Sequence, residues 1–452
     1  MGKYFGTDGF RGEANVTLGA EDAFRVGRFL GWYFQNNHGE KRGESRILIG
    51  KDPRRSSHML EHALVAGITA SGGDAYLLHE TTTPAVAYVT NRDGFDCGVM
   101  ISASHNPYYD NGIKLLNGRG EKMEEETLSL IEAYLDGSPE QLPYGTGEKI
   151  GTVVDHASGE EHYIEHLLSQ IQLSFHGMKV GLDCANGGAW KIARRVFRDL
   201  GAETYVIHGE PDGLNINRNA GSTHMESLCR LVKDQGLDMG VAFDGDGDRC
   251  LCVDEKGTVV TGDHILYLLA CEMKAQGKLD GNRVVTTVMS NLGLYKALEE
   301  QGILYAQTQV GDKYVYDYMV RNGCALGGEQ SGHIIIGKSA TTGDGILTGL
   351  MVTELVRSKG QPMSKLCRSV KTYPQVLKNI SVISKEEALH DPKVLEVAEE
   401  VAKLLGGNGR ILLRASGTEP LIRVMVEAPE EALCRDCADR VIHMIHAQGY
   451  GK

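Results

Sequence analysis

Long apolar runs, a surplus of positive charge and an apolar N-terminal segment are all missing from this sequence. No run approaches the roughly 20 apolar residues of a membrane-spanning helix, and the first residues, MGKYFGTDGF, lack the apolar core of a secretion signal. The formal net charge is -13, which argues against nucleic acid and anionic membranes as partners. We therefore expect a cytoplasmic protein with no nucleic-acid or membrane partner, whose Lys and Arg residues cluster wherever an anionic substrate binds.

Cysteine and dinucleotide-binding motifs are scarce as well. Ten cysteines in 452 residues are too few for a disulfide framework, and no glycine-rich turn of the α/β segments described below fits G-x-G-x-x-G, so NAD and FAD are not expected. One group suggests a metal site, formed by Cys434, Cys437, His443 and His446. That segment has helical periodicity, however, and at about 100° per residue the His pair points away from the Cys pair. We predict a terminal helix there rather than a zinc site.

A chain of 452 residues should contain roughly three or four domains. One pattern of strand, turn, helix, glycine and strand occurs three times, over residues 46–80, 178–209 and 283–311. Such repeats predict α/β domains with mixed or largely parallel sheets. Further helices are expected over residues 18–37 and about 159–173, and the alternating strands near the C-terminus predict a smaller α+β domain. We place the domains at residues 1–153, 154–255, 256–370 and 371–452.

The most informative stretch is GVMISASHNPYYDNGIKLL, residues 98–116. Its first residues are apolar and predict a buried strand, and Pro107 disfavours helical geometry at the residue before it. We therefore expect Ser104 and His105 in an exposed, stiff loop. A serine needs a base or a strongly electrophilic partner to act as a nucleophile, and His105 and Lys114 are the candidate bases. A capped turn without catalytic function explains the same residues equally well.

A second loop lies in GVAFDGDGDRCLCVDEKG, residues 240–257, and places Asp244, Asp246 and Asp248 at alternate positions between two apolar strands. The intervening glycines let the loop curl, and three converging carboxylates are costly without a cation. Oxygen ligands suit Mg²⁺ or Ca²⁺. An EF-hand needs glycine at the sixth position, where this loop has Arg249. We predict a Mg²⁺ site with Arg249 beside it, holding a phosphoryl group; an acidic turn in water is the alternative.

Two further loops carry groups suited to sugars and phosphates. The segment LGGEQSGHIII displays side chains for sugar hydroxyls and a carboxylate for an amino group, on Glu329, Ser331 and His333. The segment LLRASGTEPLIRVMVEA offers guanidinium groups, hydroxyls and backbone N–H groups that suit a phosphate dianion, on Arg414, Ser416, Gly417, Thr418 and Arg423. A Ser-Gly-Thr turn is also a common structural feature. The polar loop NINRNAGSTH, residues 215–224, is either a plain connection or a substrate loop.

The chain resembles the α-D-phosphohexomutase superfamily over essentially its whole length. Five motifs in order carry the resemblance: FGTDGFRG, ISASHNPYYDNGIK, DGDGDR, GGEQSGH and R-x-SGTEP-x-IRVMVE. They are most similar to the bacterial branch that acts on glucosamine phosphates. The resemblance implies three α/β domains of one topology and a smaller C-terminal α+β domain around a central cleft.

The resemblance also implies a reaction, the interconversion of glucosamine 6-phosphate and glucosamine 1-phosphate, which feeds UDP-N-acetylglucosamine synthesis. Ser104 matches the family motif, whereas the nearby Ser102 does not. Ser104 would carry a phosphoryl group, first supplied by a hexose 1,6-bisphosphate. It would donate that group to the substrate and regain one from the resulting 1,6-bisphosphate. One Mg²⁺ ion would be held by Ser104, Asp244, Asp246 and Asp248.

The remaining roles follow from the same resemblance. Arg11 and Lys114 would lie near the phosphoserine, and either His105 or Lys114 would move the proton. Sugar recognition would fall to Glu329, Ser331 and His333. The non-reacting phosphate would be held by Arg414, Ser416, Gly417, Thr418 and Arg423. A homodimer is the expected assembly.

Three other functions fit parts of the sequence. A phosphomannomutase or phosphoglucomutase of the same superfamily differs only in its sugar, and Gln330 favours the amino-sugar branch because the other branches more often carry Met there. A non-catalytic phosphosugar-binding protein would keep the phosphate loop without the complete set of catalytic residues. A phosphatase would share the first half of the reaction and pass the phosphoryl group to water.

Overall fold

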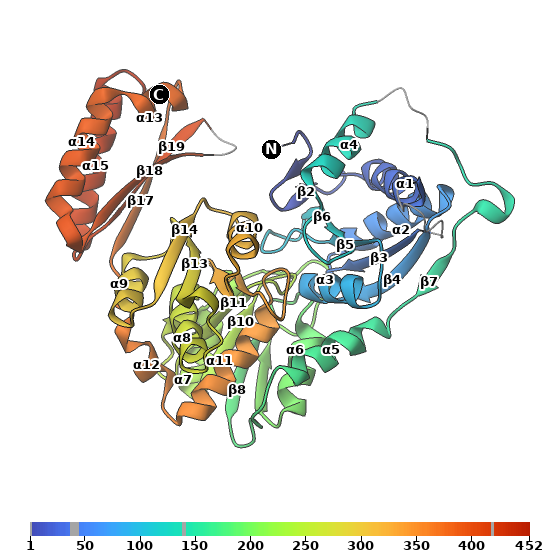
Figure 1. Cartoon of the computed structure of the whole chain (residues 1–452), viewed down its shortest axis with the longest axis horizontal. Helices are drawn as coiled ribbons and strands as arrows, with labels where there is room; N and C mark the ends of the chain where they lie inside the picture. Colours follow the sequence, from blue (N-terminus) through green and yellow to red (C-terminus); the bar gives the residue numbers. More distant parts are fainter. Residues whose placement is uncertain (1, 37–44, 138–141, 417–419) are drawn as a thin grey trace. The chain divides into compact units, whose positions relative to one another are not determined.

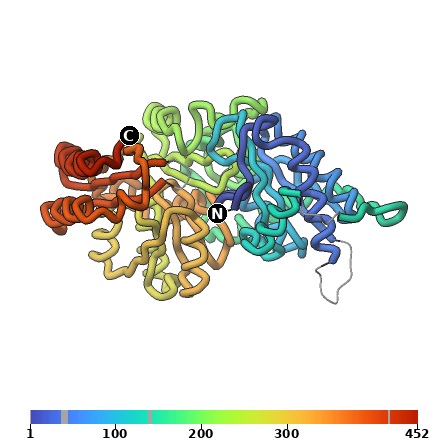
Figure 2. Tube along the Cα trace, turned by 90° about the horizontal axis from the view of Figure 1, so that it is seen from above, coloured from blue at the N-terminus to red at the C-terminus, as the bar shows by residue number. Residues whose placement is uncertain are grey.

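The computed structural model describes residues 2–36, 45–137, 142–416 and 420–452. The chain forms two compact units, which can be followed by colour along the sequence in Figures 1 and 2. The larger unit contains Met1–Met289 and Ile303–Arg368, and the smaller unit contains Ser290–Gly302 and Ser369–Lys452. Within the larger unit, three α/β domains follow one another along the chain, each with its own sheet.

The three sheets of the larger unit share one arrangement. Three parallel strands lie in the order third, first, second, and an antiparallel fourth strand pairs with the third. In the first sheet these strands are β3 (Arg46–Lys51), β4 (Asp74–Glu80), β5 (Cys97–Ile101) and β6 (Asp110–Asn117). In the second they are β8 (Lys179–Asp183), β9 (Glu203–Ile207), β10 (Met239–Phe243) and β11 (Cys250–Val253). In the third they are β13 (Arg283–Thr287), β14 (Leu304–Thr308), β15 (Leu326–Gly328) and β16 (Ile334–Ile336). The repeated topology predicted from the sequence is therefore confirmed.

Short strands extend two of these sheets. The hairpin of β1 (Phe5–Gly6) and β2 (Gly9–Glu13) pairs with β6, and β7 (Val153–Asp155) pairs with β4. In the second sheet, β12 (Val259–Val260) pairs with β11.

Helices pack beside the sheets, and those within the predicted repeats lie between their strands as expected. The first domain has α1 (Ala20–Asn36), α2 (Arg55–Ala70), α3 (Thr83–Arg92) and α4 (Glu125–Leu135). The second has α5 (Gly159–Ser169), α6 (Trp190–Asp199) and α7 (Glu226–Gln235). The third has α8 (Gly262–Ala275), α10 (Asp312–Asn322), α11 (Gly345–Lys359) and α12 (Met363–Leu366). The helices expected over residues 18–37 and 159–173 correspond to α1 and α5.

The strands form because their apolar residues are buried on both faces of the sheet. In β3, Ile47 and Ile49 pack in one core with Leu60 and Leu64 of α2, and Leu48, which points to the opposite face, is buried too. A parallel strand covered on both faces has a continuous apolar run rather than an alternating pattern. This explains why the strand ends, where polar residues begin, could be located in the sequence.

The smaller unit has a three-stranded antiparallel sheet, in the order β17 (Gln375–Ser381), β19 (Leu421–Glu427), β18 (Arg410–Ala415). Its helices are α9 (Leu292–Glu300), α13 (Lys385–His390), α14 (Pro392–Leu405) and α15 (Glu431–Ala447). The predicted terminal helix is α15: Cys434 and Cys437 are buried in the core of this unit, whereas His443 and His446 are exposed.

One predicted repeat is divided between the two units. Strands β13 and β14 belong to the larger unit, but α9 between them belongs to the smaller. The buried carboxylate of Glu427 connects α9 to the sheet, since it accepts hydrogen bonds from Leu292 N–H (2.9 Å) and from Arg410 Nε (2.7 Å). The local pattern predicted helix α9 correctly. That α9 belongs to the smaller unit depends on contacts with Glu427, which lies more than 100 residues further along the chain.

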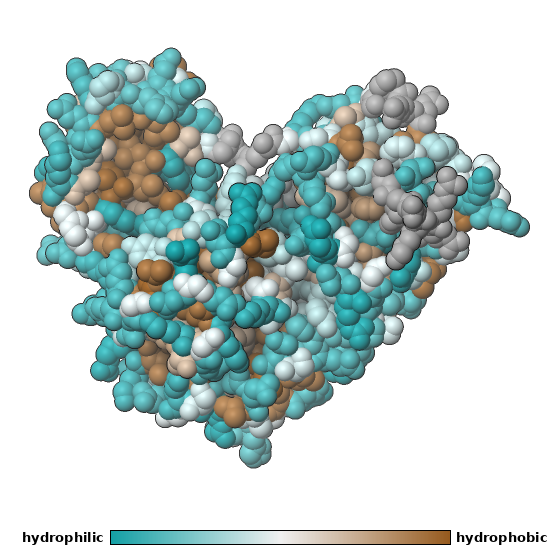
Figure 3. All heavy atoms as spheres, viewed as in Figure 1, coloured by the Kyte–Doolittle hydropathy of each residue, from teal (hydrophilic) through white to brown (hydrophobic). Residues whose placement is uncertain are grey.

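The visible surface is mostly hydrophilic, with apolar patches on both units (Figure 3). Across the described ranges, no helix is both long enough and apolar enough to cross a bilayer.

Asp344 caps α11 inside the larger unit. Its Oδ1 accepts the N–H of Leu347 (2.8 Å) and its Oδ2 accepts the hydroxyl of Tyr163 (2.9 Å). Burial raises the pKa of Asp344 to about 6, against roughly 4 in an unfolded chain. The folded state therefore binds this proton more tightly, and stability falls as pH rises between these values, by about 3 kcal/mol in total.

We predict that Asp344→Asn stabilises the protein, because asparagine keeps the cap and removes the buried charge. The gain in unfolding free energy over wild type should grow between pH 4.5 and pH 7.5, as measured by urea unfolding at both values. Asp391→Asn, at the water-accessible cap of α14, is the matched control and should show no such growth. An Asp344→Asn gain that is independent of pH contradicts the prediction.

Candidate functional site

Three loops with predicted site residues occupy the same position in the three repeated domains. Each joins the third parallel strand of its sheet to the antiparallel fourth: residues 102–109 follow β5, residues 244–249 follow β10 and residues 329–333 follow β15. In open α/β sheets, binding groups gather outside the carboxyl ends of the parallel strands. The second domain is also bonded to the third loop, since the N–H of Cys250, the first residue of β11, donates to the Gly332 carbonyl (2.9 Å).

Ser104 lies against the aspartate loop of the second domain. Its Oγ donates a 2.6 Å hydrogen bond to Oδ2 of Asp244 and lies 3.2 Å from Nδ1 of His105. The side chain is completely buried, so the prediction of an exposed loop is wrong for Ser104. The aspartate loop covers it, and a Cβ at Gly245 would collide with the Ser104 carbonyl oxygen. The covering residues lie 140 positions further along the chain, which is why the local sequence did not reveal them.

Ser102, the neighbouring hydroxyl, is engaged within the first domain. Its Oγ donates to Oδ2 of Asp52 (2.6 Å) and accepts the backbone N–H of Ser104 (2.9 Å). The Ser102 hydroxyl thus braces the loop, while the Ser104 hydroxyl contacts the aspartates.

The three aspartates of the second loop converge as the sequence pattern suggested. All are buried, and one ligand oxygen from each of Asp244, Asp246 and Asp248 lies within 4.8 Å of the other two. Asp246 Oδ1 and Asp248 Oδ1 are buried without a hydrogen-bond partner. Unpaired carboxylate oxygens are costly in a protein interior, so this donor set fits a hard divalent cation such as Mg²⁺.

Lys114 supplies only part of the positive charge that this cluster requires. Its Nζ forms an ion pair with Asp246 and lies 3.3 Å from Asp248 Oδ2. Although burial opposes the charged forms, these contacts raise the pKa of Lys114 and lower that of Asp246. Burial and the charges of the two other aspartates raise the pKa of Asp244 well above its usual value. One ammonium therefore leaves the three carboxylates short of compensation, which a divalent cation would provide.

The other predicted catalytic residues surround this cluster. Arg249 donates its backbone N–H to Asp244 Oδ1 (3.1 Å), and its buried Nε has no hydrogen-bond partner. Arg11 lies beside Asp8, 3.4 Å from its carboxylate. Burial, together with the charges of Arg249 and Arg11, lowers the pKa of His105 to about 4. An anion bound here would meet two guanidinium groups and a neutral imidazole.

The third-domain loop brings Glu329 and His333 to the same region. Glu329 Oε1 accepts the N–H of Gly311 (3.1 Å), and burial raises the pKa of Glu329. His333 is buried, and its Nε2 lies 3.9 Å from Asp248 Oδ2 of the aspartate cluster. Ser331 is half-buried between them in the loop.

Sequence reasoning missed three charged residues next to this loop. Lys122 Nζ donates to Asp312 Oδ1 (2.6 Å) and to Asp8 Oδ1 (3.2 Å), and Asp312 Oδ2 lies 3.4 Å from His333 Nε2. The repeated pattern could have identified Asp312, because this residue follows β14 at the carboxyl end of a parallel strand. The Lys122–Asp312 contact connects the first and third domains beside His333.

The smaller unit holds the remaining predicted residues. Arg414 on β18 is directly opposite Arg423 on β19. Burial and the charge of Arg423 lower the pKa of Arg414, which is the electrostatic signature of a pair suited to an anion. Ser416 is buried beside them. The predicted contacts of Gly417 and Thr418 lie outside the described residues.

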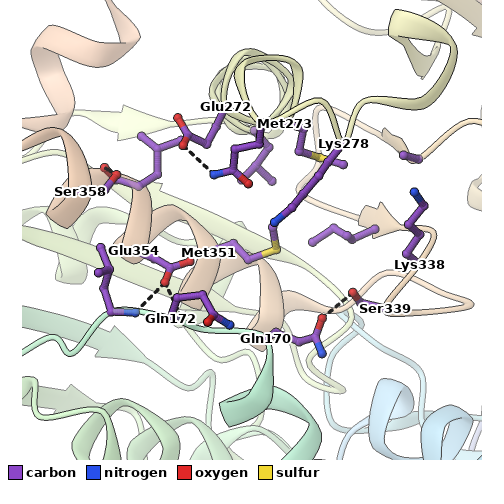
Figure 4. Close-up of a pocket in the computed structure, with 16 residues that line it drawn as sticks. Gln170, Gln172, Glu272, Met273, Lys278, Lys338, Ser339, Met351, Glu354 and Ser358 are labelled. Carbon is purple, nitrogen blue, oxygen red and sulfur yellow. Dashed lines mark hydrogen bonds between the residues drawn. The ribbon is translucent and has the colours of Figure 1, made fainter.

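A cavity of about 720 Å³ lies elsewhere in the larger unit (Figure 4). It is lined by α8, α11 and residues 170–173, and by none of the predicted site residues. Its polar groups are largely engaged with their neighbours. Glu354 accepts the backbone N–H of Gln172 (2.5 Å), and Ser339 donates to Gln170 (2.7 Å). We find no chemistry for a sugar phosphate in this cavity.

Comparison with protein families gives four matches in the order of the chain. They are described as phosphoglucomutase/phosphomannomutase alpha/beta/alpha domain I (residues 2–141), domain II (161–257), domain III (261–373) and the C-terminal domain (377–444). The four loops described above each fall in a different one of these domains.

Among known proteins, a phosphoglucosamine mutase from Lachnospira eligens is 59% identical over 450 residues, covering 100% of both chains. A phosphoglucomutase/phosphomannomutase family protein from Burkholderia thailandensis has a similar structure, with a TM-score of 0.83 at 24% identity over 99% of this chain and 98% of that one. Aspergillus fumigatus N-acetylphosphoglucosamine mutase, in complex with GlcNAc-6P and magnesium, has a TM-score of 0.68 at 16% identity over 98% and 95%. The chain therefore belongs to the phosphoglucosamine mutase family of isomerases, within the group defined by the phosphoglucomutase/phosphomannomutase domains.

Proposed function

We propose that this chain interconverts glucosamine 6-phosphate and glucosamine 1-phosphate, with Ser104 as the residue that carries the phosphoryl group. The observation behind this assignment is the buried Ser104 hydroxyl, 2.6 Å from Oδ2 of Asp244 and in the same cluster as two carboxylate oxygens, Asp246 Oδ1 and Asp248 Oδ1, that lack partners. The sugar follows from the relative from Lachnospira eligens, which is a phosphoglucosamine mutase. The product would feed UDP-N-acetylglucosamine synthesis.

The reaction consists of two phosphoryl transfers. In the first, the bond between phosphorus and Ser104 Oγ breaks as phosphorus bonds to O1 of glucosamine 6-phosphate, and the O1 proton passes to Ser104 Oγ. The resulting 1,6-bisphosphate turns over, and its 6-phosphoryl group returns to Ser104 Oγ as the Oγ proton passes to O6, leaving glucosamine 1-phosphate. His105 is the proton carrier in this scheme because its Nδ1 lies 3.2 Å from Oγ, whereas Lys114 is paired with Asp246. A hexose 1,6-bisphosphate would prime Ser104.

Asp244, Asp246 and Asp248, with the phosphoserine at position 104, would hold one Mg²⁺. The bound ion would neutralise charge on the transferring phosphoryl group, which is the main requirement of such reactions. The fungal enzyme with a similar fold was solved with magnesium. Arg11 and Arg249 would contact the same phosphoryl group, and Lys114 would hold the aspartates in place.

The remaining residues would bind the rest of the substrate. Glu329, Ser331 and His333 would contact the sugar hydroxyls and its amino group. The smaller unit would hold the non-reacting phosphate through Arg414, Ser416, Gly417, Thr418 and Arg423. The proposal assigns one loop to each of four segments, residues 1–153, 154–255, 256–370 and 371–452. It also includes a cytoplasmic location and a homodimer, with no nucleic-acid or membrane partner.

The nucleophile is tested by comparing Ser104→Ala with Ser102→Ala. Ser104→Ala should lower isomerisation of glucosamine 6-phosphate by about 10³-fold or more, because no covalent intermediate can form. It should also take up no label from a radioactive hexose 1,6-bisphosphate. Ser102→Ala should still be labelled, since that hydroxyl only braces the loop. Label on the Ser104→Ala protein would contradict the assignment.

Recognition of the amino group is tested with Glu329→Gln. Loss of one charge-assisted hydrogen bond to the ammonium should lower kcat/KM for glucosamine 6-phosphate by about tenfold, with a smaller loss for glucose 6-phosphate. Ser331→Ala is the matched comparison. It should lower kcat/KM for both substrates by the same factor, because it removes a neutral hydroxyl. A wild-type preference for glucose or mannose 6-phosphate would overturn the sugar assignment, and equal losses in Glu329→Gln would remove Glu329 from it.

A further inference from the structure

Ser104 has a backbone conformation that serine rarely adopts. Its φ angle is +50°, in the left-handed region. For a residue with a Cβ this conformation is sterically unfavourable, and it persists only where the surroundings enforce it. The peptide group that follows Ser104 must therefore be held from outside the loop.

Arg54, which is completely buried under the loop, provides the first of these restraints. Its Nε donates to Oδ2 of Asp52 (2.8 Å), the carboxylate that also accepts the Ser102 hydroxyl. Its two terminal nitrogens donate to four backbone carbonyls of the loop: those of Ser104 (2.9 Å), Asn106 (2.9 Å), Pro107 and Asp110 (3.1 Å). All five N–H groups of the guanidinium are thus used. Lysine, with three donors, could not replace them.

Asn217 provides the second restraint and comes from a different domain. It lies in the polar segment of residues 215–224, between β9 and α7, and its Nδ2 donates to the carbonyls of Ser104 (2.8 Å) and Asn106 (3.0 Å). Asn217 is buried and is itself in the left-handed region, at φ +57°. The carbonyls of Ser104 and Asn106 therefore accept hydrogen bonds both from Arg54 of the first domain and from Asn217 of the second.

We propose that Arg54 and Asn217 are positioning residues for the phosphoryl-carrying serine. By fixing the carbonyls of Ser104 and Asn106, they keep the Ser104 hydroxyl directed at Asp244 while it gains and loses a phosphoryl group. This inference rests on the proposed function. It also gives the segment of residues 215–224 a role that is neither a plain connection nor a substrate contact.

The structure offers a closely matched pair of variants for the test. Asn217→Gly removes the amide donor while glycine tolerates the left-handed backbone. Asn219→Gly is the control, because Asn219 lies in the same segment, has φ +52° and is exposed. Each would be compared with wild type for the single-turnover rate of transfer from phospho-Ser104, for kcat and KM with glucosamine 6-phosphate, and for melting temperature.

Asn217→Gly should lower the transfer rate and kcat about tenfold or more, because small misplacements of a reacting group are costly. KM and the melting temperature should stay close to wild type, and Asn219→Gly should match wild type throughout. Arg54→Lys should lower kcat further, and its melting temperature reports whether it still folds. A transfer rate for Asn217→Gly within twofold of wild type, or an equal loss in Asn219→Gly, overturns the inference. If wild type itself does not isomerise the sugar phosphate, the proposed function fails instead.

Discussion

The burial of three carboxylates at one point is the constraint on which the rest of the larger unit depends. Asp244, Asp246 and Asp248 lie in a water-poor position where like charges repel strongly, so their neighbours must offset them. Lys114 offsets one charge, and the Ser104 hydroxyl donates to another. The backbone of the loop is fixed too, because Thr83 N–H donates to the Asp246 carbonyl (2.9 Å) and Gly345 N–H to that of Gly247 (3.0 Å). Those donors come from the first and third domains, so the aspartate loop of residues 244–249 connects all three domains.

Repetition of one domain explains how these groups come together. Each of the three sheets ends its third parallel strand at a hairpin loop, and each loop carries a different kind of group: a hydroxyl, carboxylates, or residues suited to a sugar. One fold thus supplies three loops with distinct chemistry from equivalent positions. The hydrogen bond from Ser104 to Asp244 joins the first two loops directly, and the bond from Cys250, at the start of β11, to Gly332 joins the second domain to the third loop. The smaller unit carries paired arginines on an antiparallel hairpin of its own.

Sequence alone predicted what depends on local pattern. Several strands and helices, the repeated units and the convergence of the three aspartates follow from apolar runs, glycines and spacing within short windows. What it could not predict depends on contacts between distant segments. Ser104 is buried because of residues 140 positions away, and α9 belongs to the smaller unit because of Glu427. Asp312 and Lys122 were missed because neither stands in a distinctive motif, although the pair connects two domains beside His333. Arg54 likewise follows an ordinary strand end, and only the fold shows how many carbonyls it binds.

Calorimetric titration with Mg²⁺ tests the central claim most directly, namely that the buried carboxylates are an incomplete charge cluster built for a divalent cation. Wild-type protein freed of metal should bind one Mg²⁺ per chain. Asp246→Asn and Asp248→Asn should each weaken Mg²⁺ binding about tenfold or more. Each replaces a carboxylate that has an oxygen without a hydrogen-bond partner in the wild-type structure. Asp212→Asn, at an exposed carboxylate of the same domain, should bind as wild type does. No binding to wild type, or binding that survives unchanged in both loop variants, would contradict this account.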